Sequence, residues 1–333
     1  MRLTRALSLV ALIALAAPGF VAPSSAQNKK PPKTAPLPPA SPQPAAPAPS
    51  GPPADRAYGA YQRGFFLTAF NEATKRAKDN DPAAMTLLGL LYDKGQGVPR
   101  DDIKAAQWYK MAAAKGDRDA LFALAMFAFE GRAGNRDPAE GARLLTEAAK
   151  LGHPSANYDL GLLYLQGQQY AQDFNKAGEL FRVAANAGNS EAQYALAVMY
   201  KQGRGVPKDM KQAALLLAKA SIAGNVDAMV EFAIMQFNGE GTEKNESAAA
   251  DTFLRAARRG SPIAQNRLAR ILMAGRGMPA DPIEAIKWHI IAKAAGAGDP
   301  ELDAFAAKQT PQIRDAADKA AKKWMSTLAA LKP

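Results

Sequence analysis

Few residues in this chain are of a type that could do chemistry. Its 333 residues include two histidines and no cysteine, which excludes a thiol nucleophile, a thiolate metal site and a disulfide framework. His153 and His289 have no neighbouring pattern that would make either a metal ligand or half of a catalytic dyad. We therefore expect no catalytic residue, no metal site, no cofactor and no enzyme activity.

Glycine-rich loops are the other candidates for chemistry, because Gly-x-Gly segments can cradle phosphates. Such segments occur at 95–97, 203–205 and 275–277, each followed by valine or methionine and then proline. No strand is expected before them and no Gly-Lys-Ser/Thr follows, so the phosphate-loop motif is incomplete. Two glycines that permit positive φ and a proline that stiffens the return are typical of a turn between helices.

These loops recur because residues 81–296 divide into six segments of 36 residues that align without a gap. The segments are 81–116, 117–152, 153–188, 189–224, 225–260 and 261–296. In every segment the fourth and thirty-second positions are alanine, and the fifteenth and thirty-sixth are glycine. A repeat of this regularity indicates one structural unit used six times.

Each recurring residue has a physical role in that unit. The final glycine can adopt the left-handed conformation that ends a helix. The next residue then caps the following helix, as expected for all but His153 among Asp81, Asp117, His153, Asn189, Asn225 and Ser261. The alanines let helices approach closely, and one helix pair cannot bury its apolar face alone. The sequence therefore predicts an all-α fold, a right-handed α-solenoid of six helix-turn-helix repeats with a concave inner surface.

The regions on either side of the repeats are predicted to be capping helices, and the first residues of the chain a signal peptide for export. Residues 55–80 look like a degenerate helix pair, and 297–333 a short helix followed by a long one, so both ends of the array are capped. Residues 1–26 have Arg2 and Arg5 before an apolar stretch and small residues before Ala26, which indicates a signal peptide cleaved after Ala26. An uncleaved anchor is the rival, disfavoured because Pro18 and Gly19 interrupt a short apolar run.

Between signal and array, residues 27–54 form a proline- and alanine-rich linker, expected to be extended and disordered. No segment after the signal is long enough and apolar enough to span a membrane. The predicted location is therefore the periplasm. Cleavage would remove Arg2 and Arg5 and reduce the formal charge of +11 to +9. A basic chain can bind nucleic acid, but export argues against that partner.

The segments resemble Sel-1-like repeats, short-loop relatives of tetratricopeptide repeats. The resemblance rests on the Ala-x-x-x-Leu-Gly first helix (84–89), the Gly-x-Gly-Val-Pro loop and the alanine-rich second helix, and it covers 81–296. A family branch with paired cysteines and penicillin binding is excluded by the absence of cysteine. Exported α-proteobacterial members include regulators that bind the periplasmic domain of a sensor kinase. The resemblance thus implies a periplasmic interaction module, with a periplasmic sensor domain as one candidate partner.

The predicted partner-binding residues form a stripe at the sixth, tenth and thirteenth positions of the first helices. They are Phe122, Met126, Phe129, Tyr158, Leu162, Leu165, Tyr194, Val198 and Phe237. One interpretation is that these side chains only pack against adjacent repeats. The other is an apolar groove that accepts an extended segment or a helix of a protein or peptide ligand.

Basic residues are also scattered along the second helices, Lys110, Arg143 and Arg182 among them. They are typical of a solvated face, with attraction to an anionic glycan as a weaker alternative. We therefore expect a scaffold or regulator of another protein, active in envelope signalling. The alternative is a cell-envelope glycan-binding factor or an enzyme-associated protein.

Overall fold

The computed structural model describes residues 55–330, with side chains through 327, and these residues form 16 α-helices and no strand. The predicted signal peptide, the cleavage site after Ala26 and the linker 27–54 lie outside the described residues. Within the part of the chain that is described, no helix combines the length and the apolar character needed to cross a membrane.

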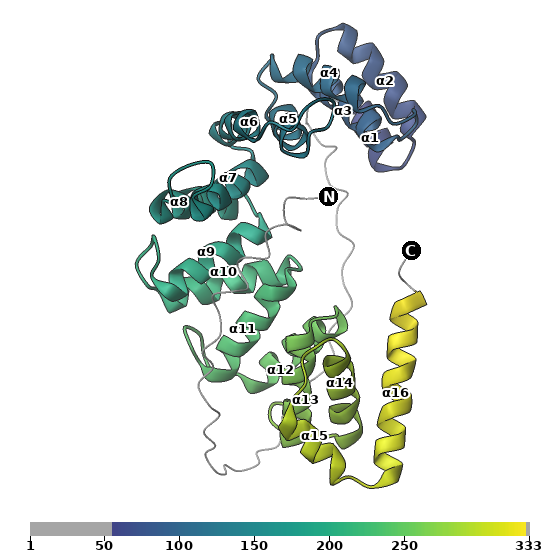
Figure 1. Cartoon of the computed structure of the whole chain (residues 1–333), viewed down its shortest axis with the longest axis vertical. Coiled ribbons are helices and arrows are strands. Elements are labelled where there is room, and N and C mark those ends of the chain that lie inside the picture. Colours follow the sequence, from purple (N-terminus) through teal and green to yellow (C-terminus); the bar gives the residue numbers. More distant parts are fainter. Residues whose placement is uncertain (1–54, 331–333) are drawn as a thin grey trace, which may run out of the picture. The chain divides into compact units, whose positions relative to one another are not determined.

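The six repeats are six antiparallel helix pairs, each stacked on the next along the chain (Figure 1). The predicted all-α solenoid of helix-turn-helix repeats is therefore confirmed. The pairs are α3 (Pro82–Lys94) with α4 (Asp102–Ala113), α5 (Arg118–Glu130) with α6 (Pro138–Lys150), α7 (Pro154–Gln166) with α8 (Phe174–Asn186), α9 (Ser190–Gln202) with α10 (Met210–Ile222), α11 (Val226–Asn238) with α12 (Glu246–Arg258), and α13 (Pro262–Ala274) with α14 (Pro282–Ala294).

The helices begin and end where the repeat pattern predicts. Asp117 accepts a hydrogen bond from the Ala120 N–H at 2.8 Å, and the equivalent residues cap the other first helices. A cap of this kind contributes about 1 kcal/mol. His153 was the expected exception, yet its Nδ1 accepts the Ala156 N–H at 3.0 Å. A neutral imidazole thus replaces the usual carboxylate or amide.

Small residues let the two helices of a repeat approach closely. The fourth-position and thirty-second-position alanines are all buried. A Cβ added to Gly89 would lie 2.6 Å from the Tyr109 ring, and one added to Gly161 would lie 2.6 Å from the Phe181 ring. Glycine at the ninth position therefore makes room for an aromatic ring of the second helix.

Helices α1 (Arg56–Gln62) and α2 (Phe66–Lys78) precede the first repeat. Phe66 lies one repeat length before Asp102, and Asn80, with φ of 63°, stands where the repeats have their closing glycine. At the other end come α15 (Pro300–Ala307) and α16 (Pro311–Ala330). The rings of Trp288 on α14 and Trp324 on α16 meet edge to face, with centroids 5.2 Å apart. Both ends of the array are thus covered by helices.

Candidate partner-binding surface

The predicted stripe divides by burial into two groups. Phe129, Leu162 and Phe237 are only 8%, 5% and 5% exposed. The Phe129 ring lies about 3.0 Å from where a Cβ of Gly141 would be, and the Arg276 guanidinium lies 4.4 Å above the Phe237 ring. These three side chains fill the interior between helices, so the expectation that they contact a ligand is corrected.

The other six predicted residues are partly exposed, and they lie on α5, α7 and α9. They are Phe122, Met126, Tyr158, Leu165, Tyr194 and Val198. Partial exposure leaves each side chain anchored on one side and accessible on the other. This is the arrangement expected of aromatic and aliphatic contact residues at an interface.

Side-chain contacts join the first helices of neighbouring repeats. The Phe122 ring stacks on His153, with centroids 4.4 Å apart and planes 17° apart. The His153 Nε2 lies 3.3 Å from an Asp119 carboxylate oxygen. Further along, Lys201 on α9 forms an ion pair with Glu231 on α11. Between these two pairs of helices, the Glu191 carboxylate of α9 lies close enough to Tyr158 of α7 to raise the pKa of its phenol. The first helices α5, α7, α9 and α11 are therefore linked in order along this side of the array.

Tyr158 and Tyr194 are the most distinctive residues of this surface. Neither hydroxyl forms a hydrogen bond with another described residue. Burial raises the pKa of both phenols, and nearby carboxylates raise it further: Asp159 and Glu191 at Tyr158, Glu231 and Asp227 at Tyr194. Both phenols therefore stay neutral and keep a proton to donate.

The same surface carries five carboxylates, at the third and seventh positions of the repeats. They are Asp119, Asp159, Glu191, Asp227 and Glu231. Restricted contact with water raises the pKa of Asp227, and so does the Glu231 carboxylate one turn away. We call these five carboxylates and the six partly exposed residues above the first-helix face. From the sequence we considered only the basic residues of the second helices and missed these acidic residues of the first helices. Their recurrence at the third and seventh repeat positions could have revealed them.

In the sixth repeat, the side chains at the sixth and tenth positions bond to the C-terminal part of the chain itself. Asn266 and Arg270, at the sixth and tenth positions, contact an Asp299 carboxylate oxygen at 3.0 and 2.6 Å. Arg270 also pairs with Glu301 at 2.8 Å. Asp299 itself accepts the Glu301 N–H at 3.0 Å and so caps α15. The face is therefore closed by α15 at this end.

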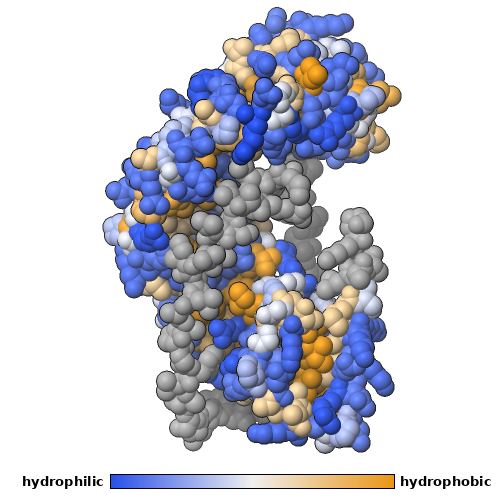
Figure 2. Space-filling view, in the orientation of Figure 1, coloured by the Kyte–Doolittle hydropathy of each residue, from blue (hydrophilic) through white to orange (hydrophobic). Residues whose placement is uncertain are grey.

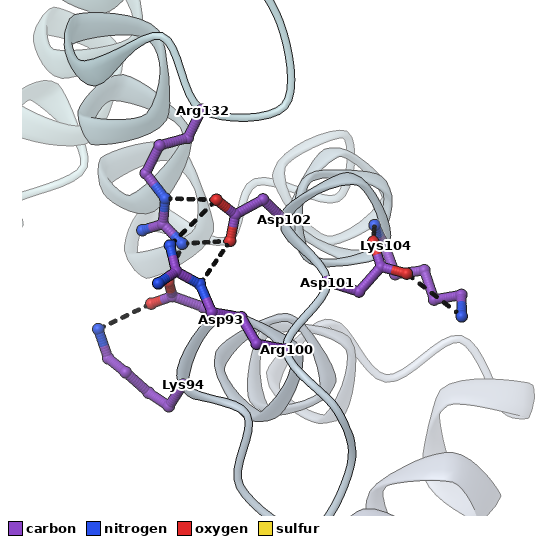
Figure 3. A network of polar contacts seen from close by, with 7 residues as sticks. All are labelled: Asp93, Lys94, Arg100, Asp101, Asp102, Lys104 and Arg132. Carbon is purple, nitrogen blue, oxygen red and sulfur yellow. Dashed lines mark hydrogen bonds and ion pairs between the residues drawn. The ribbon is translucent and has the colours of Figure 1, made fainter.

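The loops between the two helices of a repeat hold a second type of polar contact, which reaches the preceding repeat (Figure 3). Arg132, in the loop of the second repeat, pairs with both Asp93 and Asp102 of the first. Its guanidinium holds the pKa of Asp102 well below the ordinary value. Arg276 pairs in the same way with Glu246 at 2.5 Å. These contacts connect one repeat to the next.

Helix α14 and the C-terminal helices line a cavity of about 530 Å³. Buried His289 meets Asp303 there, at 2.8 Å from its Nε2, and Lys293 shares that carboxylate at 2.7 Å. No serine, threonine or tyrosine lines the cavity to serve as a nucleophile. The described side chains also include no group of three or more potential metal ligands in contact.

Comparison with known proteins agrees with the repeat architecture. The Sel1 repeat family model matches at 82–117, 118–153, 154–189, 190–225, 226–261 and 262–296. The crystal structure of a Sel1 repeat protein from Oxalobacter formigenes is 27% identical, with a TM-score of 0.61 over 72% of this chain and 97% of its own. The protective antigen c5321 of uropathogenic Escherichia coli, with an SLR fold, is 24% identical, with a TM-score of 0.54 over 84% of this chain and 72% of its own.

No curated protein matches the sequence. The family model, in contrast, covers the whole array of helix pairs. The repeated alanines and glycines, the helix pairs and the family match all lead to one assignment: the chain belongs to the Sel1 repeat family.

Proposed function

We propose that this protein is a periplasmic scaffold or regulator that binds a segment of another protein on its first-helix face, in envelope signalling. Sel1 repeat proteins act as protein–protein interaction modules. The periplasmic location follows from the signal peptide predicted at 1–26, and the envelope role from the family resemblance.

One observation carries the proposal: Tyr158 and Tyr194 are half-buried on the first-helix face and their hydroxyls have no partner among the described residues. A tyrosine in this state offers a fixed apolar ring and an unused hydrogen bond. Tyrosine is enriched at the centres of protein interfaces for these reasons. Phe122, held against His153, extends the same surface into the second repeat.

The second helices supply a control position for a test of this proposal. The side of the array visible in Figure 2 is mainly hydrophilic, with hydrophobic residues in separate patches. Two aliphatic residues of α10, Leu215 and Ile222, are 49% and 83% exposed. Isolated exposed aliphatic residues are ordinary on protein surfaces. Leu215 is therefore a suitable control position.

The experiment is capture of envelope proteins by the immobilised chain 27–333, followed by mass spectrometry. We expect a double variant, Tyr158→Ser with Tyr194→Ser, to lose at least ~10-fold in capture of the partner. Leu215→Ser should capture as much as the unchanged chain. Circular dichroism must show equal helix content for all three. Equal capture by the double variant would contradict the proposal.

A further inference from the structure

The first-helix face has a charge opposite to that of the whole chain. The chain has a formal charge of +11. The face nevertheless carries five carboxylates, and Lys201, beside it on α9, already pairs with Glu231. Arg132 and Arg276, in the loops, and Arg270, on α13, also pair with carboxylates. Asp119 pairs with Arg118 and contacts His153. Glu191 and Asp227 form no ion pair with a described residue, and each lies close enough to a tyrosine of the face to raise the pKa of its phenol.

Asp227 and Glu191 are the two carboxylates of this face that have no counterion among the described residues. Asp227 and Glu231 lie four residues apart on α11, a spacing at which like charges repel and destabilise a helix. Glu231 has Lys201 as a counterion, whereas no ion pair joins Asp227 to a described residue. Glu191 accepts a hydrogen bond from Ser190 at 2.9 Å and forms no ion pair either. A positive charge brought to this place would relieve the repulsion.

We propose that the segment bound by the first-helix face is basic, and that Tyr158 and Tyr194 with Glu191 and Asp227 receive its lysine or arginine side chains. This inference rests on the proposed function, since it names the chemistry of the partner for the same surface.

The residues of the first-helix face suit both the aliphatic stem and the cationic head of a lysine or arginine side chain. The aliphatic stem of lysine or arginine packs on an aromatic ring, and its cationic head is attracted to the ring face. The carboxylates of Glu191 and Asp227 accept charge-assisted hydrogen bonds from the head. The tyrosine hydroxyls donate to backbone carbonyls of the bound segment. Phe122, Met126 and Val198 would contact its apolar residues.

Charge complementarity also decides against anionic partners on this face. Phosphate groups of lipids or nucleic acids, and the carboxylates of an acidic glycan, would be repelled by Glu191 and Asp227, which have no ion pair to a described residue. An acidic protein segment would be repelled in the same way. A neutral apolar segment would leave Asp227 without a counterion.

The test uses a random dodecapeptide display library selected on the chain 27–333. Peptides that also bind the Tyr158→Ser and Tyr194→Ser double variant are discarded. The most enriched peptide is synthesised in two forms, one unchanged and one with arginine replaced by citrulline and lysine by acetyl-lysine. Their dissociation constants are measured by fluorescence polarisation at low and high salt.

Three proteins are compared in this measurement. They are the unchanged chain, a Glu191→Gln/Asp227→Asn variant, and a Glu243→Gln/Asp251→Asn variant, which is a control with the same loss of charge at exposed sites.

We expect enriched peptides with net positive charge. The affinity should fall at least ~10-fold for the peptide whose basic side chains are neutralised. It should fall by a similar factor for the Glu191→Gln/Asp227→Asn variant, and it should be weaker at high salt than at low salt. The control variant should bind as the unchanged chain does. Neutral or acidic selected peptides, or equal binding by the Glu191→Gln/Asp227→Asn variant, would overturn the inference while leaving the proposed function intact. If no peptide depends on the two tyrosines, the proposed function itself fails.

Discussion

The same repeat positions serve opposite purposes in two regions of the array. In the sixth repeat, Asn266 and Arg270 at the sixth and tenth positions are bonded to Asp299, a residue 5% exposed. In the third and fourth repeats, Tyr158 and Tyr194 at the sixth position make no such bond. The repeat fold fixes where these side chains lie, and it leaves open what they contact.

The difference shows how a binding surface is distinguished from a structural contact in a repeat protein. A helix that is to be covered by its own chain presents side chains that match the covering helix, as Arg270 matches Asp299. On the first-helix face, the hydroxyls of Tyr158 and Tyr194 form no hydrogen bond, and the Asp227 carboxylate forms no ion pair, with a described residue. The following changes test this contrast, from the largest expected effect to the smallest.

Asp299→Ala should destabilise the C-terminal end of the array by about 2–4 kcal/mol. It removes the cap of α15 and the buried one of the two carboxylates that pair with Arg270, leaving this partly buried cation with exposed Glu301 alone. Urea unfolding followed by tryptophan fluorescence, to which Trp288 and Trp324 contribute, measures the loss. Asp227→Ala on the first-helix face is the matched control and should change stability by less than ~0.5 kcal/mol. Equal effects of the two changes would remove the contrast.

Arg132→Ala should cost about 1–3 kcal/mol, since the buried Asp93 and the Asp102 carboxylate lose their shared cation. A double-mutant cycle with Asp102→Ala isolates the interaction between the two repeats. Because the pKa of Asp102 is lowered in the folded chain, its contribution is present at neutral pH and is lost as pH falls below the ordinary value of 3.8. Additive single and double variants would show that this junction contributes nothing.

His153 should make the second and third repeats sensitive to mild acid. Burial lowers its pKa, and only the neutral ring can accept the Ala156 N–H while Asp117, Arg118 and Asp119 surround it. The unfolded chain then binds the proton more readily, so stability falls by about 1 kcal/mol as pH decreases below 6.5. Thermal unfolding across this range measures the loss. His153→Asn, which supplies the cap used at Asn189 and Asn225, should abolish the dependence; an unchanged pH profile would assign it to other groups.

Asp227→Asn should raise stability slightly, by about 0.2–0.5 kcal/mol, because it removes the repulsion with Glu231. The same variant should bind the basic peptide less well. Calorimetry of the free protein and polarisation of the labelled peptide measure the two effects. A loss of stability would mean that Asp227 has a structural role and that the face is less open than proposed.

Most of the fold could be predicted because the same helix-pair sequence pattern occurs six times in the chain. Helix boundaries follow from the capping residues and glycines, and close approach of the helices follows from the alanines. His153 showed the limit of capping rules, since an imidazole took the place of an amide.

The candidate site was predictable only in part. Periodicity placed all nine residues on one stripe, but it could not reveal that the side chains of Phe129 and Phe237 turn inward. That depends on Gly141 and on Arg276, which lie on other elements of the array. Pairing across repeats, such as Lys201 with Glu231, likewise needs the distance between helices. The unused groups at Tyr158 and Tyr194 emerge only once these contacts are known.

The most direct test of the account is photo-crosslinking from the first-helix face. A benzoylphenylalanine placed at Tyr194 in the chain 27–333, and in a second protein at Leu215 on α10, is irradiated in envelope extract. The account predicts a covalent adduct with one partner protein from position 194 and none from position 215. An adduct from 215 with none from 194 would contradict it.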